Sequence, residues 1–90
     1  MAVPAETARL HDEIIVSSNG VDHEIKYEPH EAASALLEAA LNAFHIHDAR
    51  HTYALWTESG VELPITGSAQ EAGVRPGDVL FLRPSVVRGG

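Results

Sequence analysis

The fold is decided by residues 13–28, which read EIIVSSNGVDHEIKYE. The first six are largely apolar and β-branched and predict a strand, and Asn19-Gly20 after them is the dipeptide best suited to the positive φ angles of a type I′ hairpin turn. From residue 21 onward, side chains for a buried face alternate with charged ones, which is the period of a second strand. The stretch therefore predicts a β-hairpin with Lys26 on its solvent face.

The chain beyond the hairpin contains one helical pattern and several short strand patterns. Pro29 ends the second strand because it cannot donate to a ladder, and Pro64 cuts off a later one for the same reason. Ser68 is placed to cap a short helical turn that Gly73 stops. The expected elements are an amphipathic helix over 31–46, strands over 52–57 and 61–63, a helical turn over 69–72 and a last strand over 79–83.

This order, ββαββ followed by a helical turn and a strand, predicts an α+β domain in which one helix covers one face of the sheet. The length of 90 residues suits a single domain. We expect three parts along the chain: a flexible leader over 1–11, the folded domain over 12–83 and a flexible tail over 84–90 that ends in Gly-Gly.

Composition excludes several classes of protein. The chain has no cysteine, so it is neither a disulfide-stapled mini-protein, a Cys-ligated zinc module nor a thiol enzyme. Its 13 acidic and 6 basic residues give a net charge of −7, which argues against nucleic acid as a partner because phosphate contacts need a basic surface. No apolar run approaches the ~20 residues of a membrane span. We expect a cytoplasmic protein that is monomeric when free.

The element order, together with the ending Val87-Arg88-Gly89-Gly90, resembles the ubiquitin-like β-grasp family over residues 13 to 90. Tyr27-Glu28-Pro29 ahead of the helix resembles the Val-Glu-Pro that opens the ubiquitin helix. Residues 73–82 resemble the turn and last strand before the ubiquitin tail. The resemblance implies a ubiquitin-like β-grasp, a mixed sheet of about five strands wrapped on one helix.

The resemblance also implies a function. The nearest counterparts in character are bacterial ubiquitin-like proteins encoded beside an adenylating enzyme, a conjugating-enzyme-like protein and a JAB-type metallopeptidase, several of them associated with antiviral defence against phage. By that resemblance the chain is a protein modifier and not an enzyme. The carboxylate of Gly90 is adenylated, passed as a thioester to partner cysteines and joined to an amine on a target protein. The activating partner uses ATP, and the chain itself binds no cofactor.

The end of the chain suits this chemistry. Gly89 and Gly90 have no Cβ, so they can enter a narrow channel in an extended form and present the terminal carbonyl. Arg88 adds a fixed positive charge and a planar donor fork just outside that channel. Ubiquitin has an arginine that its activating enzyme reads near the position of Val86, so Val86 and Val87 imply a dedicated activating enzyme here.

The outer face of the sheet is the expected partner-binding patch. Alternation along three strand patterns directs Ile15, Trp56 and Phe81 away from the helix. Large apolar groups exposed on a sheet face mark partner sites, and in ubiquitin-like proteins the matching face is the main recognition surface. For Trp56 the opposite parity, a core position, stays open because one bulge reverses every later side chain.

Six histidines in the sequence invite a metal site, and His45, His47 and His51 lie close together with Asp48. Their spacing crosses a helix end and has no HExxH-like frame, which favours a solvated helix terminus and no metal site. His23 instead occupies an inward position of the second strand.

Two other functions stay open on the sequence. Related β-grasp proteins that end in Gly-Gly act as sulfur carriers, which are adenylated and converted to a C-terminal thiocarboxylate. A non-covalent adaptor that binds through the sheet face would not need the tail. A modifier would offer Lys26, its single lysine, and the N-terminus as acceptors for self-conjugation, so we expect mostly single modifications.

Overall fold

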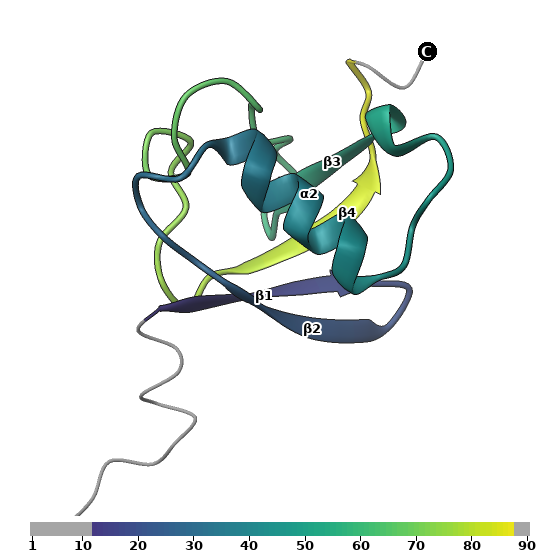
Figure 1. The fold of residues 1–90 in the computed structure, drawn as a ribbon, viewed down its shortest axis with the longest axis horizontal. Helices are drawn as coiled ribbons and strands as arrows, with labels where there is room; N and C mark the ends of the chain where they lie inside the picture. The colour runs from purple at the N-terminus through teal and green to yellow at the C-terminus, as the bar shows by residue number, and fades with distance from the viewer. Residues whose placement is uncertain (1–11, 88–90) are drawn as a thin grey trace, which may run out of the picture.

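The computed structural model describes residues 12–87. Within these residues the strands form a four-stranded sheet in the order β2-β1-β4-β3, and α2 lies across one face of it (Figure 1). The leader over 1–11 and the last three residues of the expected tail, 88–90, lie outside the described residues. In chain order the elements are β1 (Glu13–Ser18), β2 (Val21–Lys26), α2 (Ala33–Ala43), the 3₁₀ helix η1 (Arg50–Thr52), β3 (Tyr53–Thr57) and β4 (Val79–Pro84).

β1 and β2 form the predicted hairpin, paired antiparallel over all six residues of each strand. Asn19 and Gly20 have φ angles of 52° and 81°, both positive as a type I′ turn requires. β2 ends at Lys26, earlier than the alternation indicated, although Tyr27 beyond it is still buried.

The sheet is mixed because β4 runs parallel to β1 and antiparallel to β3. A parallel pair needs a crossover connection, and the segment that contains α2 and β3 supplies it. The C-terminal strand therefore lies inside the sheet, with a hydrogen-bonded neighbour on each side. The residues after β4 are therefore attached to a central strand of the sheet.

The helix is shorter than the predicted span of 31–46. Ala32 is still extended at ψ 140°, so helical backbone begins at Ala33. At the other end His45 has a φ of 56°, and the amides of His45 and Ile46 donate to the carbonyls of Asn42 and Leu41. These two bonds define a Schellman motif, with a histidine in the left-handed position that glycine usually takes. Histidine tolerates that conformation better than most residues, so the helix ends here without a glycine that would mark its end in the sequence.

The predicted number of five strands is wrong for the described residues, which form four. The expected strand over 61–63 makes only an isolated bridge, between Trp56 and Glu62. Pro64 limits its length, and its backbone bonds to β3 run from the Thr57 amide to the Val61 carbonyl and from the Leu63 amide to the Leu55 carbonyl. The segment therefore covers the edge of β3 without extending the sheet regularly.

The connection between β3 and β4 is fastened to the start of α2. The amides of Ala69 and Gln70 donate to the carbonyls of Glu31 and Pro29 at 2.8 and 3.1 Å. Ser68 and Glu71 cap the expected turn reciprocally, each side chain accepting from the other's amide. Residues 69–73 are hydrogen-bonded turns, and no regular helix forms there.

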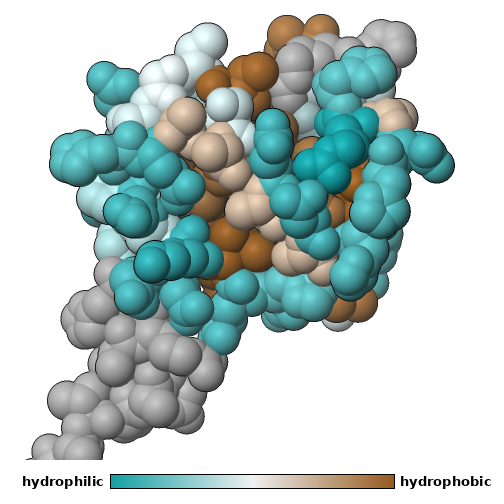
Figure 2. Space-filling view, in the orientation of Figure 1, coloured by the Kyte–Doolittle hydropathy of each residue, from teal (hydrophilic) through white to brown (hydrophobic). Residues whose placement is uncertain are grey.

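The core lies between α2 and the inner face of the sheet, and its side chains follow the predicted alternation and helical spacing. On the helix side, Figure 2 shows hydrophilic residues around a smaller apolar area in the middle of the face. No helix among the described residues has the length and apolar character needed to cross a membrane. The most deeply buried large side chains are Ile14, Val16, Leu36, Leu41 and Leu80.

Candidate functional site

Trp56 and Phe81 lie directly opposite each other on the outer face of the sheet. They are Cα partners in the β3 and β4 ladder, while their neighbours Leu55 and Leu82 point into the core. Both outer side chains are half-buried. Ile15 is half-buried on β1, next to Val79 on β4, so it lies diagonally from Phe81 across the parallel pair. These three residues, Ile15, Trp56 and Phe81, are called the outer patch.

The sequence left open whether Trp56 lies on the outer face of the sheet or in the core, and its position has features of both. Its parity is outward, but its Nε1 is buried and has no hydrogen-bond partner among the described residues. A buried indole N–H without an acceptor is unfavourable, so this arrangement costs stability. The outer patch is therefore part of a packed surface layer and not a group of projecting side chains.

Arg83 belongs to the same face, and the sequence reasoning missed it. Its guanidinium carbon lies 4.8 Å from the centre of the Phe81 ring, which is cation–π geometry. Alternation along β4 could have placed it, because it is two residues beyond Phe81. On the far side of the sheet face, β2 contributes exposed Asp22 and Glu24. An apolar area with one cation beside it and acids at its border suits a protein partner.

The tail begins as an ordered segment. The Ser85 amide donates to the Thr52 carbonyl of η1 at 2.6 Å, and Ser85 is buried at 5% exposure. Its hydroxyl donates to Oε2 of Glu62 at 2.5 Å, and the Val86 amide donates to Oε1 of the same carboxylate at 2.9 Å. The prediction of a flexible tail from residue 84 is therefore wrong for residues 84–87.

Glu62 is the residue that sequence reasoning passed over. It stands between Val61 and Leu63, and Leu63 is buried at 8% exposure. In a segment that alternates, the side chain beside a buried leucine points the other way. That signal places Glu62 off the core, but nothing in the sequence connects it to a serine 23 residues away.

The residues expected to meet the activating enzyme are placed only in part. Val86 and Val87 are 80% and 79% exposed, so both side chains are available to a partner. Arg88, Gly89 and Gly90 lie outside the described residues. Lys26 is exposed at the end of β2, opposite Glu13 of β1.

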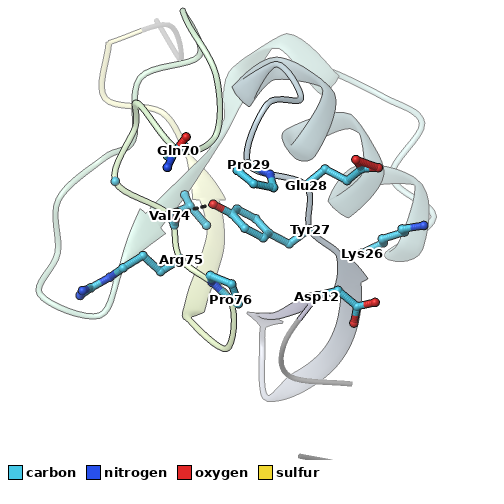
Figure 3. Close-up of a pocket in the computed structure, with 10 residues that line it drawn as sticks. Asp12, Lys26, Tyr27, Glu28, Pro29, Gln70, Val74, Arg75 and Pro76 are labelled. Atoms are coloured by element: carbon cyan, nitrogen blue, oxygen red, sulfur yellow. Dashed lines mark hydrogen bonds between the residues drawn. The ribbon is translucent and has the colours of Figure 1, made fainter. Parts of the chain in front are cut away.

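Lys26 also borders a groove of about 760 Å³ beside the start of α2. Figure 3 shows Tyr27 across this groove, its hydroxyl directed at Val74, with Lys26 and Arg75 pointing away from each other on opposite sides. The Tyr27 hydroxyl donates to the Val74 carbonyl at 2.7 Å. Burial raises the pKa of Tyr27 above its ordinary value, and the charges of Asp78 and Glu31 raise it further. The Tyr27 phenol in this groove is therefore neutral, and the charged side chains that line the groove do not gather at one point.

The histidines do not come together. His23 packs edge-on against Phe44, with ring centroids 4.5 Å apart, and is half-buried. His45, His47 and His51 are exposed. Within residues 12–87, no group of three or more His, Cys, Asp or Glu side chains is arranged to hold a metal ion.

Comparison with known proteins supports the fold. No family model matches the chain, and no curated protein matches it. The crystal structure of ATBAG1 in complex with HSP70 matches over 86% of this chain, with a TM-score of 0.69 and 17% identity. A protein designed de novo on the basis of ubiquitin matches over 82% of it, with a TM-score of 0.69 and 19% identity.

The two matches differ in how much of the other protein they include. The chain covers 88% of the ubiquitin-based design but 42% of the ATBAG1 structure's chain, less than half of its length. At these identities the likeness shows the fold alone. The domain has the ubiquitin-like β-grasp fold: a mixed sheet, four strands in the described residues, wrapped on one face by α2.

Proposed function

We propose that this chain is a ubiquitin-like protein modifier, joined through the carboxylate of Gly90 to an amine of a target protein. The observation that carries the proposal is the path of the C-terminal end. β4 lies between β1 and β3 and leads directly into a segment whose valine side chains are exposed. The sequence then ends in Arg88-Gly89-Gly90. A firmly held strand that leads toward Arg88-Gly89-Gly90 suits a carboxylate that must be passed from one enzyme to another.

The chemistry proposed for Gly90 has three steps. Its carboxylate attacks the α-phosphate of an ATP held by an adenylating partner, which releases pyrophosphate and leaves an acyl-adenylate. A cysteine thiolate of a partner then displaces AMP and forms a thioester. Finally the amine of the target attacks the thioester carbonyl, loses a proton and expels the thiolate, leaving an amide. The chain is the acyl group in each step and catalyses none of them.

The partners proposed are an adenylating enzyme, a conjugating-enzyme-like protein and a JAB-type peptidase that removes the modifier. The outer patch, with Arg83 beside it, would be the surface on which they dock. Val86 and Val87 would be read by the activating enzyme. We place this system in the bacterial cytoplasm, in antiviral defence, on the resemblance of the tail and element order to ubiquitin-like proteins of that kind.

A non-covalent binding module is the second candidate. It is favoured by one comparison: the same fold covers 42% of a longer chain, the ATBAG1 structure solved in complex with HSP70. A β-grasp domain can thus serve inside a larger protein. In that role the sheet face would bind a partner and the Gly-Gly end would be dispensable.

The intact mass of the chain isolated from its own cells separates these functions. A modifier appears partly as branched conjugates, which disappear when Gly89 and Gly90 are both replaced by alanine. A sulfur carrier appears at a mass in which one oxygen at the terminus is exchanged for sulfur. An unmodified chain that retains its partners after loss of Gly89 and Gly90 would overturn the modifier function and support the binding module.

A further inference from the structure

The first residues of the tail are held by polar bonds and not by apolar packing. Val86 and Val87 leave about four fifths of their surface in solvent, so their side chains contribute little burial. Two of the bonds that hold this segment run to Glu62: from the Ser85 hydroxyl at 2.5 Å and from the Val86 amide at 2.9 Å. The three residues Glu62, Ser85 and Val86 are called the clamp.

Ser85 is the central member of the clamp. Its amide is tied to the Thr52 carbonyl, its hydroxyl donates to Glu62, and the same oxygen accepts the Val87 amide at 3.0 Å. A hydroxyl can donate once and accept as well, so this one buried side chain links Glu62 to Val87. Hydrogen bonds to an ionised carboxylate are stronger than bonds between neutral groups, which makes Glu62 the member on which the others depend.

We propose that Glu62 is a positioning residue for the tail: its carboxylate holds Ser85 and Val86 against the domain and so limits how much of the tail a partner can take up. The bonds of this segment reach as far as the Val87 amide. If the bonds to Glu62 broke, a partner could also take up Val86 and Val87, while the Ser85 amide would still donate to the Thr52 carbonyl. These two residues would add about 7 Å of reach at ~3.3–3.6 Å per residue. Glu62 thereby shortens the length of chain that a partner can take up without breaking bonds.

This inference deepens the proposed function, and its consequence for conjugation rests on that function. An enzyme that needs only the last three residues would accept the clamped protein. An enzyme whose channel is deeper, or a peptidase that binds the tail as an extended strand, would first have to break the bonds to Glu62. The clamp would then favour partners built for a short free end.

Trypsin cleavage after Arg88 measures the clamp without any conjugation partner. The protease must bind Val86 and Val87 in extended form, and the Val86 amide is engaged by Glu62. We expect Glu62→Ala to speed this cleavage by roughly tenfold or more, because cleavage follows the population of the open form. Glu58→Ala is the matched control, since it removes an exposed glutamate from the turn after β3.

Two further variants separate a local from a global effect. Ser85→Ala leaves the bond from the Val86 amide to Glu62 in place, so its cleavage rate should fall between wild type and Glu62→Ala. Glu62→Gln keeps one acceptor oxygen and should recover part of the protection. If Glu62→Ala lowers overall stability, cleavage after Lys26, at the end of β2, will also accelerate, and the ratio of tail to internal cleavage then reports the clamp alone.

Hydrogen exchange at the amides of Val86 and Val87 gives the second readout. We expect it to rise by about tenfold in Glu62→Ala and to stay unchanged in Glu58→Ala. Equal tail cleavage and equal exchange in wild type and Glu62→Ala would overturn the positioning role and leave the proposed conjugation untouched. A protected tail on a protein that forms no conjugates would leave the clamp standing and remove its proposed use.

Discussion

Replacing Tyr27 with phenylalanine tests how the loop before β4 is held to the start of α2. The Tyr27 hydroxyl donates to the Val74 carbonyl at 2.7 Å, and the two residues are 47 positions apart. Both are buried, at 4% and 2% exposure, so water cannot replace the lost donor easily. The ring stays in place in Tyr27→Phe, and the change is confined to one hydrogen bond (Figure 3).

The expected loss is about 1–3 kcal/mol of unfolding free energy, because a buried carbonyl is left without its partner. A domain of this size is stable by only ~5–15 kcal/mol, so the effect is large. Each kcal/mol should lower the melting temperature by roughly 4–8 °C. Urea unfolding followed by the fluorescence of Trp56, the only tryptophan, measures it directly. An unfolding free energy within about 0.5 kcal/mol of wild type, the range of ordinary surface substitutions, would refute this account of the loop.

Further outcomes follow from the same contacts. The raised pKa of Tyr27 means that the folded state binds this proton more tightly than the unfolded state. The contribution of Tyr27 to stability should therefore be complete below the ordinary tyrosine pKa near 10 and be lost as the pH rises above it. Urea unfolding measured at several pH values checks this, and the loss should be absent in Tyr27→Phe. Gly20→Ala should lower the unfolding free energy by ~1–2 kcal/mol because φ at this position is 81°, although a Cβ there would meet nothing within 4 Å. Asn19→Gly should be nearly neutral. Equal urea midpoints for the two variants would contradict this prediction. Leu36→Ala, at 1% exposure on α2, should cost ~2–5 kcal/mol by thermal unfolding, and a cost below 1 would mean that the helix is not packed as described. Where self-conjugates form, their bands should disappear from gels when Lys26→Arg is combined with a blocked N-terminus. Conjugate bands that persist would count against the predicted acceptors.

The hairpin and the core could be read from the sequence because they depend on short-range signals. Asn19-Gly20 specifies its turn locally, and alternation assigns the inner face of β1 and β4 correctly. The helix end was misplaced by three residues, since the left-handed position is held by His45 and no glycine marks it. The strand over 61–63 was overestimated because its length is limited by Pro64, and three residues can satisfy their backbone with a bridge alone.

The candidate site was accessible to sequence reasoning only where alternation applies. The outward parity of Trp56 and Phe81 follows from one period, but that period does not predict that Nε1 of Trp56 is buried. The clamp could not be predicted from the sequence, for a stronger reason. Glu62 and Ser85 belong to segments with no repeating pattern, and their bond exists only because the chain path brings the end of β4 beside the segment that follows β3.

The central claim is that Gly90 is joined to amines of other proteins. Trypsin cuts after Arg88, so every conjugated lysine should carry a Gly89-Gly90 remnant that mass spectrometry of digested cell proteins can locate. The account predicts such remnants on target lysines in cells that express the natural chain, and their loss when both terminal glycines are replaced by alanine while the protein remains folded. Remnants that are absent, or whose number does not change with that replacement, would contradict it.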